Sequence, residues 1–330
     1  SLVFLPLIVT RVHFFSTYFE YVFPIVIAGA VIILTGLIDD VRELAPLPKL
    51  LGILFAALII WFFTDFHFDS FKIPFGGPLL VFPTWLAFCL TVLWIVAITN
   101  AINLIDGLDG LVAGVSIISL LTMGIVSYFF LYDSNIFLSL TIFVLVAAIA
   151  GFLPYNYHPA IIYLGDTGAL FIGFMIGVFS LQGLKNSTAV AVVTPIIILG
   201  VPITDTVVAI IRRKLSGQKI YEADRMHLHH RLLSLGLTHR GTVLVIYAIS
   251  FIFSLTSLLL NISSQAGGVL LVVSLALGVE ILCELIGIFG ENRTPVLNLL
   301  RFIGNSSYRQ EMIAKRKTKR SDSQDTKEKN

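Results

Sequence analysis

Long apolar segments follow one another along most of this chain, separated by short polar stretches. A helix that crosses the hydrocarbon core of a bilayer needs about 20 apolar residues. Hydrophobic residues make up 57% of the sequence and charged residues 13%, with a mean hydropathy of +0.93, which is far too apolar for a soluble domain. We therefore predict an all-α, polytopic membrane helical bundle with about nine complete spans, at residues 21–38, 50–63, 81–99, 111–131, 136–153, 160–181, 189–211, 242–260 and 268–289.

Both ends of the sequence differ from this regular pattern. Residues 2–10 have the composition of the end of a further, partial span, and the first residue is not Met, so we expect an N-terminal piece to precede this sequence. Residues 291–330 turn polar and are strongly basic at 315–320. We expect a basic tail that is disordered at its end and attracted to anionic lipid headgroups.

Basic residues are distributed unevenly between the two sides of the membrane. If the spans alternate in direction, Arg42, Lys49, the basic group at 212–240 and the tail all fall on one side. Only Arg11, Lys72 and Lys185 fall on the other. By the positive-inside rule, the side that carries more basic residues is cytoplasmic.

The sequence NAINLIDGLDG, residues 100–110, places four polar side chains at a membrane boundary. If this segment is helical, side chains that recur every third residue lie within one half of the helix surface, and the segment presents one polar face. The alternative is a solvated loop between two spans, with glycine-assisted helix ends. The four residues are Asn100, Asn103, Asp106 and Asp109.

Two further acids, Asp39 and Asp40, end the first complete span. Such a pair can hold a metal, position a phosphate or act as a base, although a hydrated helix end would also explain it. Lys49, at the start of the next span, is either a boundary lysine that extends to the interface or a phosphate contact.

The segment at 154–173 places further polar groups on the predicted cytoplasmic side, including Asn156, His158 and Asp166. Asp166 precedes an apolar run, as a helix N-cap would, and His158 reads as a structural histidine. Further on, Asp205 lies just inside the membrane boundary, where pairing with Arg212 or Arg213 is the favoured interpretation.

Three histidines and an arginine follow in the longest internal polar loop: His227, His229, His230 and Arg231. They could bind zinc, but the loop offers no cysteine or fourth ligand to complete a tetrahedron. Arg225 and Arg231 nearby favour an anion, because guanidinium and imidazole groups both donate to phosphate oxygens. A solvated basic loop is the remaining alternative.

These unusual polar groups all fall on the predicted cytoplasmic side. Carboxylates together with asparagine suggest an oxygen-ligand site for Mg²⁺, which commonly uses one or two carboxylates plus substrate phosphates. Basic groups beside it suit a polyanionic substrate. The combination fits phosphoryl transfer from a soluble donor to a lipid acceptor, in which positioning and charge neutralisation supply most of the catalysis.

Four ordered motifs, GLIDD, NAINLIDGLDG, NYHPAIIYLGDTG and HLHHR, closely resemble those of the polyprenyl-phosphate N-acetylhexosamine-1-phosphate transferases, a glycosyltransferase family 4 group. The resemblance extends over residues 21–289. HLHHR is similar to the branch that initiates teichoic acid, enterobacterial common antigen or O-antigen synthesis. The alternative phospho-muramoyl-pentapeptide branch usually has three consecutive histidines, and Leu228 interrupts that run here.

The resemblance implies transfer of GlcNAc-1-phosphate, or a related N-acetylhexosamine-1-phosphate, from a UDP-sugar to undecaprenyl phosphate, with release of UMP. It also implies Mg²⁺, with Mn²⁺ as a possible substitute, a multi-pass location in a bacterial plasma membrane, and no nucleic acid partner. A homodimer is compatible with it. Residues 1–290 would be the integral membrane catalytic domain, with cytoplasmic active-site loops.

The family's motifs also assign expected roles to the residues that match them. Asn103 and Asp166 would hold Mg²⁺, and Asp39 and Asp40 would lie at the lipid phosphate, one of them as the candidate base. Lys49 would contact phosphate. The nucleotide side would be lined by Asp106, Asp109 and Asn156, and the diphosphate or sugar would meet His227, His229, His230 and Arg231.

Two mechanisms and two other function classes stay open. A phosphomonoester has a second pKa near 6, so the acceptor is already mostly dianionic at pH 7 and needs orientation more than deprotonation. Direct attack and a covalent aspartyl intermediate both remain compatible with the motifs. A secondary transporter would place its acids near the bilayer midplane, within an internal repeat. A non-catalytic scaffold is the third class.

Overall fold

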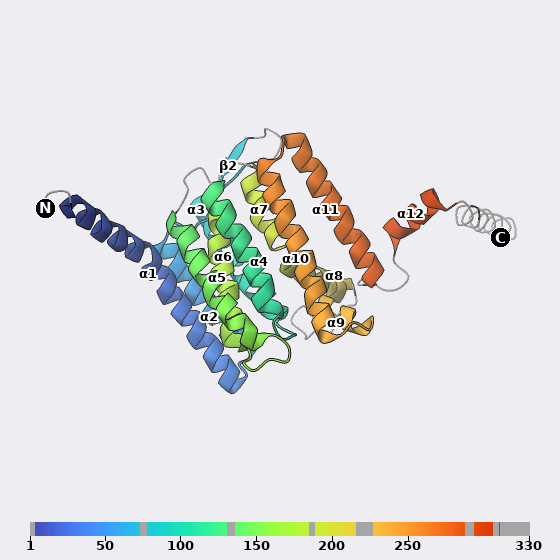
Figure 1. Cartoon of the computed structure of the whole chain (residues 1–330), viewed down its shortest axis with the longest axis horizontal. Coiled ribbons are helices and arrows are strands. Elements are labelled where there is room, and N and C mark those ends of the chain that lie inside the picture. Colours follow the sequence, from blue (N-terminus) through green and yellow to red (C-terminus); the bar gives the residue numbers. More distant parts are fainter. Residues whose placement is uncertain are drawn as a thin grey trace, which may run out of the picture. The chain divides into compact units, whose positions relative to one another are not determined.

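Figure 1 shows the computed structural model of the chain. The structure describes residues 4–72, 78–130, 136–184, 189–215, 227–287 and 294–305, together with residue 310. The chain divides into two compact units, Ser1–Val272 and Val273–Asn330, which we describe separately.

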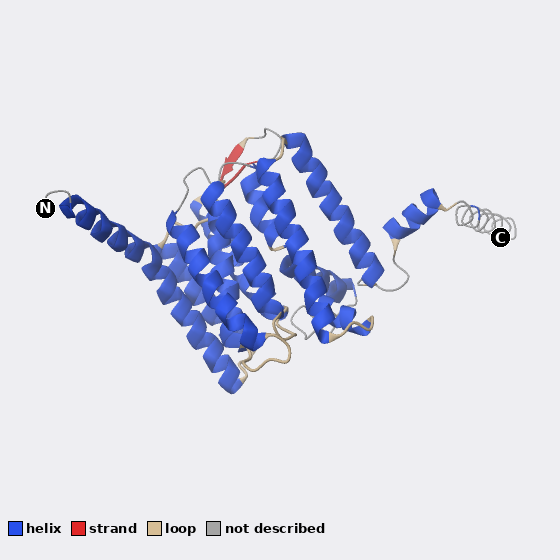
Figure 2. Cartoon of the chain, viewed as in Figure 1, coloured by secondary structure: helices blue, strands red, loops and turns tan. Residues whose placement is uncertain are grey.

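Helices make up nearly all of the described residues, as Figure 2 shows. The only strands described are β1 (Ser70–Lys72) and β2 (Leu79–Val81), which pair antiparallel with Ser70 opposite Val81. The prediction of an all-α membrane protein is confirmed. The helices of the first unit are α1 (Phe4–Arg42), α2 (Pro46–Phe63), α3 (Thr84–Leu104), α4 (Leu111–Phe129), α5 (Ile136–Asn156), α6 (Gly165–Leu184), α7 (Ala189–Ile198), α8 (Gly200–Leu215), α9 (Leu228–Ser234) and α10 (His239–Ile262); α11 (Gln265–Ile286) crosses the boundary between the units, and α12 (Pro295–Gly304) lies in the second.

Each of the nine predicted spans coincides with helical structure, but only seven helices among the described residues are long and apolar enough to cross a membrane. The predicted span at 160–181 begins later, because α6 starts at Gly165. The predicted span at 189–211 is divided into α7 and α8.

Proline explains the break between α7 and α8. Pro202 has no N–H group to donate to the carbonyl of Ile198, four residues earlier. The Ser119 hydroxyl of α4 lies 3.4 Å from that carbonyl oxygen and donates to it instead. The interrupted helix is therefore supported by a neighbouring one.

Packing in the first unit brings helix ends from distant parts of the sequence together. α6 packs against α1 and α3, α2 packs against α1, and α4 packs against α5 and α10. The loops at 105–110 and 157–164 and helix α9 lie at one end of this bundle, opposite the β1–β2 hairpin (Figures 1 and 2). The predicted functional residues therefore gather at a single end of the first unit.

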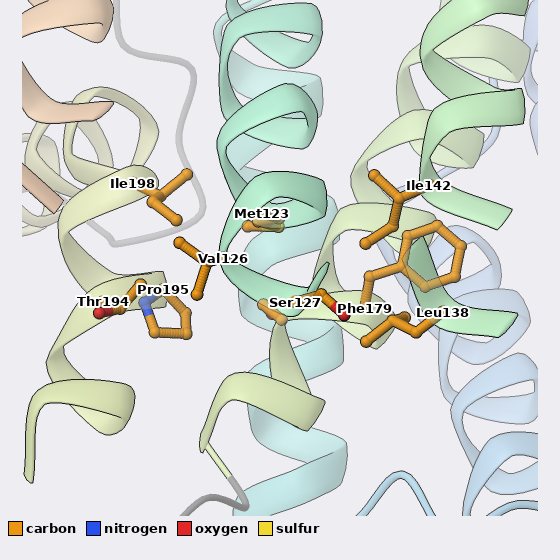
Figure 3. Close-up of a pocket in the computed structure, with 10 residues that line it drawn as sticks. Met123, Val126, Ser127, Leu138, Ile142, Phe179, Thr194, Pro195 and Ile198 are labelled. Atoms are coloured by element: carbon orange, nitrogen blue, oxygen red, sulfur yellow. The ribbon is translucent and has the colours of Figure 1, made fainter. Parts of the chain in front are cut away.

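A small cavity lies between α4, α5, α6 and α7 (Figure 3). Its lining is mostly apolar, with the hydroxyl groups of Ser127, Ser180 and Thr194 at its wall. Ser127 lies near the end of α4, whereas the predicted functional loop precedes the start of α4. The cavity therefore belongs to the half of the bundle away from the candidate site.

The second unit contains a buried acid with a structural role. Glu284 of α11 accepts hydrogen bonds from the backbone N–H groups of Val296 and Leu297, each at 2.7 Å. It thereby caps α12, which lies within the segment predicted to be a tail. The basic stretch at 315–320 and the rest of 311–330 lie outside the described residues.

Candidate active site at the helix ends

Lys49 joins two acids that are far apart in the sequence. Its Nζ lies 2.8 Å from Asp39 Oδ2 at the end of α1, and 3.0 Å from Asp166 Oδ1 in the first turn of α6. Asn103, near the end of α3, places Nδ2 2.5 Å from the same Asp166 oxygen. Four helices thus bring two carboxylates, an ammonium group and a carboxamide into one cluster.

Asp40 lies beside this cluster and holds the first turn of α6. Its Oδ1 accepts from the backbone N–H of Asp166 at 2.7 Å. Its Oδ2 accepts from the backbone N–H and the hydroxyl of Thr167, at 3.0 and 2.5 Å. Capping of its own helix was one interpretation of Asp166 in the sequence. In the structure, Asp40 of α1 accepts from these terminal N–H groups instead.

Gly165 is required for this arrangement on two grounds. Its φ of +65° is in the left-handed region, which other residues adopt only with strain. A Cβ there would also lie 2.9 Å from Asp40 Oδ2. The glycine therefore allows the Asp40 carboxylate to approach the helix terminus.

The central sequence stretch is helical only in its first half. α3 ends at Leu104, and residues 105–110 form turns, so the predicted single helical face is wrong beyond that point. Asn100 donates to the carbonyl of Val96 in its own helix at 2.8 Å. The four polar residues therefore separate: Asn103 joins the lysine cluster, while Asp106 and Asp109 lie in the loop.

Asp106 is surrounded by negative charge. Burial, together with the neighbouring carboxylates of Asp166, Asp109 and Asp40, raises its pKa to about 7. Such an excess of carboxylates is the electrostatic condition that a bound cation relieves.

Asp109 forms a second cluster with the loop after α5. Its Oδ2 lies 2.8 Å from His158 Nδ1 and accepts from the Ala160 N–H at 3.2 Å. Burial would raise the pKa of Asp109, but the hydrogen bonds from His158 and Ala160 and the nearby His239 lower it overall. Asp109 is therefore a fixed carboxylate.

Gly110 connects this loop to two helices. Its N–H donates to the side-chain oxygen of Asn156 at 3.1 Å, and its carbonyl accepts from the Tyr247 hydroxyl of α10. Asn156 also donates from Nδ2 to the carbonyl of Ile162 at 3.0 Å. Asn156 thus fixes the 105–110 loop to the 157–164 loop.

The histidine segment is attached to the same end of the bundle. Asp205 of α8 accepts from His227 Nδ1 at 2.9 Å and from the Leu228 N–H at 2.8 Å. The favoured sequence interpretation had Asp205 pairing with an arginine, and the structure adds this histidine contact. Arg225, the basic residue used to argue for an anion, lies outside the described residues.

His229 brings the segment against the central loop. A Cβ on Gly107 would collide with the His229 ring. Burial and the neighbouring His230 lower the pKa of His229 to about 4, so its imidazole is neutral at pH 7. The buried Nε of Arg231 and Nε2 of His229 have no hydrogen-bond partner among the described residues. The Arg231 Nε–H is a donor, whereas Nε2 of a neutral His229 is a donor or an acceptor according to its tautomer.

The residues present fit a hard divalent cation. Asp166 offers a carboxylate that is 37% exposed, and the carboxamide of Asn103 beside it carries an oxygen. One or two protein oxygens plus substrate phosphates are the usual Mg²⁺ set. Asp106 lies near the carboxylates of Asp166, Asp109 and Asp40, which together with its burial raise its pKa, and a cation among these acids would offset their repulsion.

Sequence reasoning missed three contributors: Thr167, Tyr247 and His239. Thr167 lies inside a motif already quoted, so its position was a usable signal. Tyr247 lies in an apolar span and His239 at the start of the same helix. Nothing local in the sequence links either one to residues 109–110.

The fold and the site together define a polytopic membrane protein with an acidic, lysine-bridged cluster at the ends of its helices. A family model for glycosyl transferase family 4 matches residues 22–184. The chain belongs to glycosyl transferase family 4.

Curated relatives extend this likeness beyond the region that the family model matches. The chain is 44% identical over 272 residues to a probable undecaprenyl-phosphate N-acetylglucosaminyl 1-phosphate transferase of Bacillus subtilis, covering 82% of this chain and 75% of that protein. It is 34% identical to the decaprenyl-phosphate N-acetylglucosaminephosphotransferase of Mycobacterium leprae, covering 68% of this chain and 60% of that protein. It is 27% identical to an undecaprenyl-phosphate alpha-N-acetylglucosaminyl 1-phosphate transferase of Salmonella typhi, over 67% of this chain and 60% of that protein.

Proposed function

We propose that this protein transfers GlcNAc-1-phosphate, or a related N-acetylhexosamine-1-phosphate, from its UDP-sugar to undecaprenyl phosphate. The products are undecaprenyl-diphosphate-linked sugar and UMP. Family membership and the names of the similar proteins from Bacillus subtilis and Salmonella typhi support the reaction class. The HLHHR sequence supports the N-acetylglucosamine branch over the phospho-muramoyl-pentapeptide branch.

The observation that carries the proposal is the position of Lys49 between Asp39 and Asp166, with Asn103 on the second acid. A reaction between two phosphorylated substrates needs positive charge to offset their repulsion. Lys49 supplies one such charge, and its 18% exposed side chain lets a phosphate reach it. The acids hold the ammonium group in place.

Asn103 and Asp166 would hold Mg²⁺, with Mn²⁺ as a substitute. When bound, such a cation neutralises charge on the diphosphate of the sugar donor. The protein's own contribution is positional: Asp40 fixes the turn that carries Asp166, and Asn103 orients the Asp166 carboxylate.

The contacts of Asp39 and Asp40 favour orientation over proton removal. Asp39 accepts from the Leu44 N–H at 2.7 Å and from Lys49, and Asp40 accepts three hydrogen bonds from α6. A carboxylate committed to such donors is a weaker base. Because the acceptor phosphate is mostly dianionic at pH 7, transfer does not depend on its deprotonation.

The remaining groups would recognise the donor. Asp106, Asp109 and Asn156 share the loop region that would face the nucleotide. His227, His229, His230 and Arg231 would offer donors to the diphosphate or sugar, and the unpartnered Arg231 Nε supports that role. We place this end of the bundle at the cytoplasmic face of a bacterial plasma membrane, where soluble UDP-sugars are available.

The main rival is a secondary transporter, which would need acids near the bilayer midplane. In the described part of the chain, Asp39, Asp40, Asp106, Asp109 and Asp166 all lie at helix ends or in loops. That arrangement favours an interfacial enzyme.

The test is transfer of radiolabel from UDP-GlcNAc, labelled in the sugar, to undecaprenyl phosphate by the purified full chain, with Mg²⁺ and with chelator. We expect metal-dependent labelled lipid and stoichiometric UMP. Asp166→Asn should abolish transfer while the protein stays folded, and Asp69→Asn, in the segment just before β1, should leave transfer unchanged. A well-folded wild type that transfers none of several UDP-N-acetylhexosamines would refute the proposal.

A further inference from the structure

Asp109, His158 and His239 form a cluster of a different chemical character from the lysine-bridged acids. Each offers one ligand atom, and these three atoms lie within 4.8 Å of one another. His158 Nδ1 and Asp109 Oδ2 are 2.8 Å apart. The rings of His158 and His239 are stacked, with centroids 3.9 Å apart and planes at 16°.

The cluster contains a nitrogen that lacks a partner. His239 Nε2 is buried and has no hydrogen-bond partner among the residues that the structure describes. Buried polar atoms are rarely left without a partner, and such an atom calls for an explanation. A ligand that accepts or shares the nitrogen lone pair would provide one.

The three side chains are positioned by structure that does not depend on a ligand. Ala160 N–H donates to Asp109, and Arg240 Nε donates to the His158 carbonyl at 3.0 Å. His239 is the first residue of α10, which begins at the Thr238 cap. The donor atoms therefore come from three segments that these hydrogen bonds hold to one another.

We propose that Asp109, His158 and His239 bind a transition-metal dication of the zinc class. Two imidazole nitrogens and one carboxylate oxygen are a common three-ligand zinc set, with water completing the tetrahedron. Imidazole suits Zn²⁺, Co²⁺ and Ni²⁺, whereas Mg²⁺ prefers oxygen ligands. The site is thus distinct in ligand type from the pair Asn103 and Asp166.

Metal binding here replaces the proton between His158 and Asp109, which leaves to solvent. The metal ligands must also draw closer together, since Zn–N and Zn–O bonds are about 2.0–2.2 Å long. Because Asp109 belongs to the proposed nucleotide side, an occupied site should inhibit transfer. Only this expected inhibition rests on the proposed function. Measuring metal retention tests the metal site independently of that function.

The primary experiment measures metal retention by the purified full chain in detergent, with Mg²⁺ present in excess. After incubation with Zn²⁺ and desalting, wild type should retain one equivalent by elemental analysis, and Co²⁺ should give the visible absorption of a tetrahedral site. His239→Phe keeps a ring for stacking but removes the nitrogen. It should weaken metal binding by more than the roughly 10- to 100-fold caused by loss of an outer-shell partner.

Three comparisons make the result decisive. His67→Gln, in the loop before β1, should retain metal as wild type does. Asp109→Asn should weaken retention as His239→Phe does, which guards against a folding defect in one variant. No retention by wild type, or retention lost in His230→Gln but kept in His239→Phe, would overturn the proposal and place any bound metal in the histidine segment.

Inhibition is a separate readout. Micromolar Zn²⁺ should slow transfer by wild type and have a much weaker effect on His239→Phe. If wild type retains zinc but shows no transfer under any condition, the metal site stands and the proposed function fails. If transfer is normal and zinc is not retained, the proposed function stands and the metal site fails.

Discussion

Replacing Gly165 with alanine tests whether the turn that carries Asp166 controls catalysis. The φ of +65° at this position costs a non-glycine residue about 1–2 kcal/mol. The new Cβ would also meet the two carboxylate oxygens of Asp40 at 2.9 and 3.1 Å. Because Asp40 is exposed, its side chain can withdraw, but the α6 terminus then loses its acceptor, at about 0.5–2 kcal/mol.

These two effects sum to about 1.5–3 kcal/mol when the second is discounted for exposure. If the strain is relieved by moving the turn, Asp166 leaves its position beside Lys49 and Asn103. At 1.36 kcal/mol per factor of ten, transfer should then fall by about 10- to 100-fold.

The assay is the initial rate of labelled lipid formation, with the unfolding temperature measured on the same preparations. Gly151→Ala is the matched control, because Gly151 lies inside α5 with open space around its Cβ position. We expect the control to match wild type in rate. Wild-type rate and stability in Gly165→Ala would refute the reasoning about this turn.

Three further substitutions probe the other contacts. Lys49→Met removes the cation between two carboxylates and should lower transfer by at least about tenfold, measured with labelled donor. Gly107→Ala should displace His229 and raise the KM for the UDP-sugar more than it changes the unfolding temperature; an unchanged KM would contradict the contact. The pKa of folded Asp109 is lowered, so its stabilisation is present above its ordinary pKa near 3.9 and is lost as pH falls through the folded value. The difference in unfolding temperature between wild type and Asp109→Asn should therefore shrink below about pH 4, and a difference that grows on acidification would contradict the assignment.

The sequence predicted the helical class because 20-residue apolar runs have few other structures open to them. It also predicted that Asn103, Asp109 and Asp166 lie at one end of the bundle, because alternating spans return to the same side. It did not predict the ends of helices within polar motifs. At 105–110 the glycines and local hydrogen bonds determine the backbone conformation. The three-residue spacing of the polar groups, on which the helical prediction was based, does not determine it.

Sequence patterns could not predict contacts between elements that are far apart in the chain. Capping signals are local, yet the carboxylate that caps α6 belongs to Asp40, 126 residues before Asp166. The same holds for Tyr247. A tyrosine in an apolar span gives no functional signal in the sequence, and only the structure shows that its hydroxyl donates to the Gly110 carbonyl. Such partners depend on which helices pack together.

Under the proposed function, the position of Lys49 predicts that cation and lipid phosphate binding are coupled. Its ammonium group, 3.0 Å from Asp166 Oδ1, balances the charge of that carboxylate when no metal is bound. A dication at Asp166 would repel the ammonium group and leave it with Asp39 alone, where it could pair with an incoming phosphate. Charge balance therefore assigns Lys49 two alternative partners, so higher undecaprenyl phosphate should lower the Mg²⁺ concentration that gives half-maximal transfer. That dependence should disappear in Lys49→Met, and its persistence there would show that another group carries the coupling.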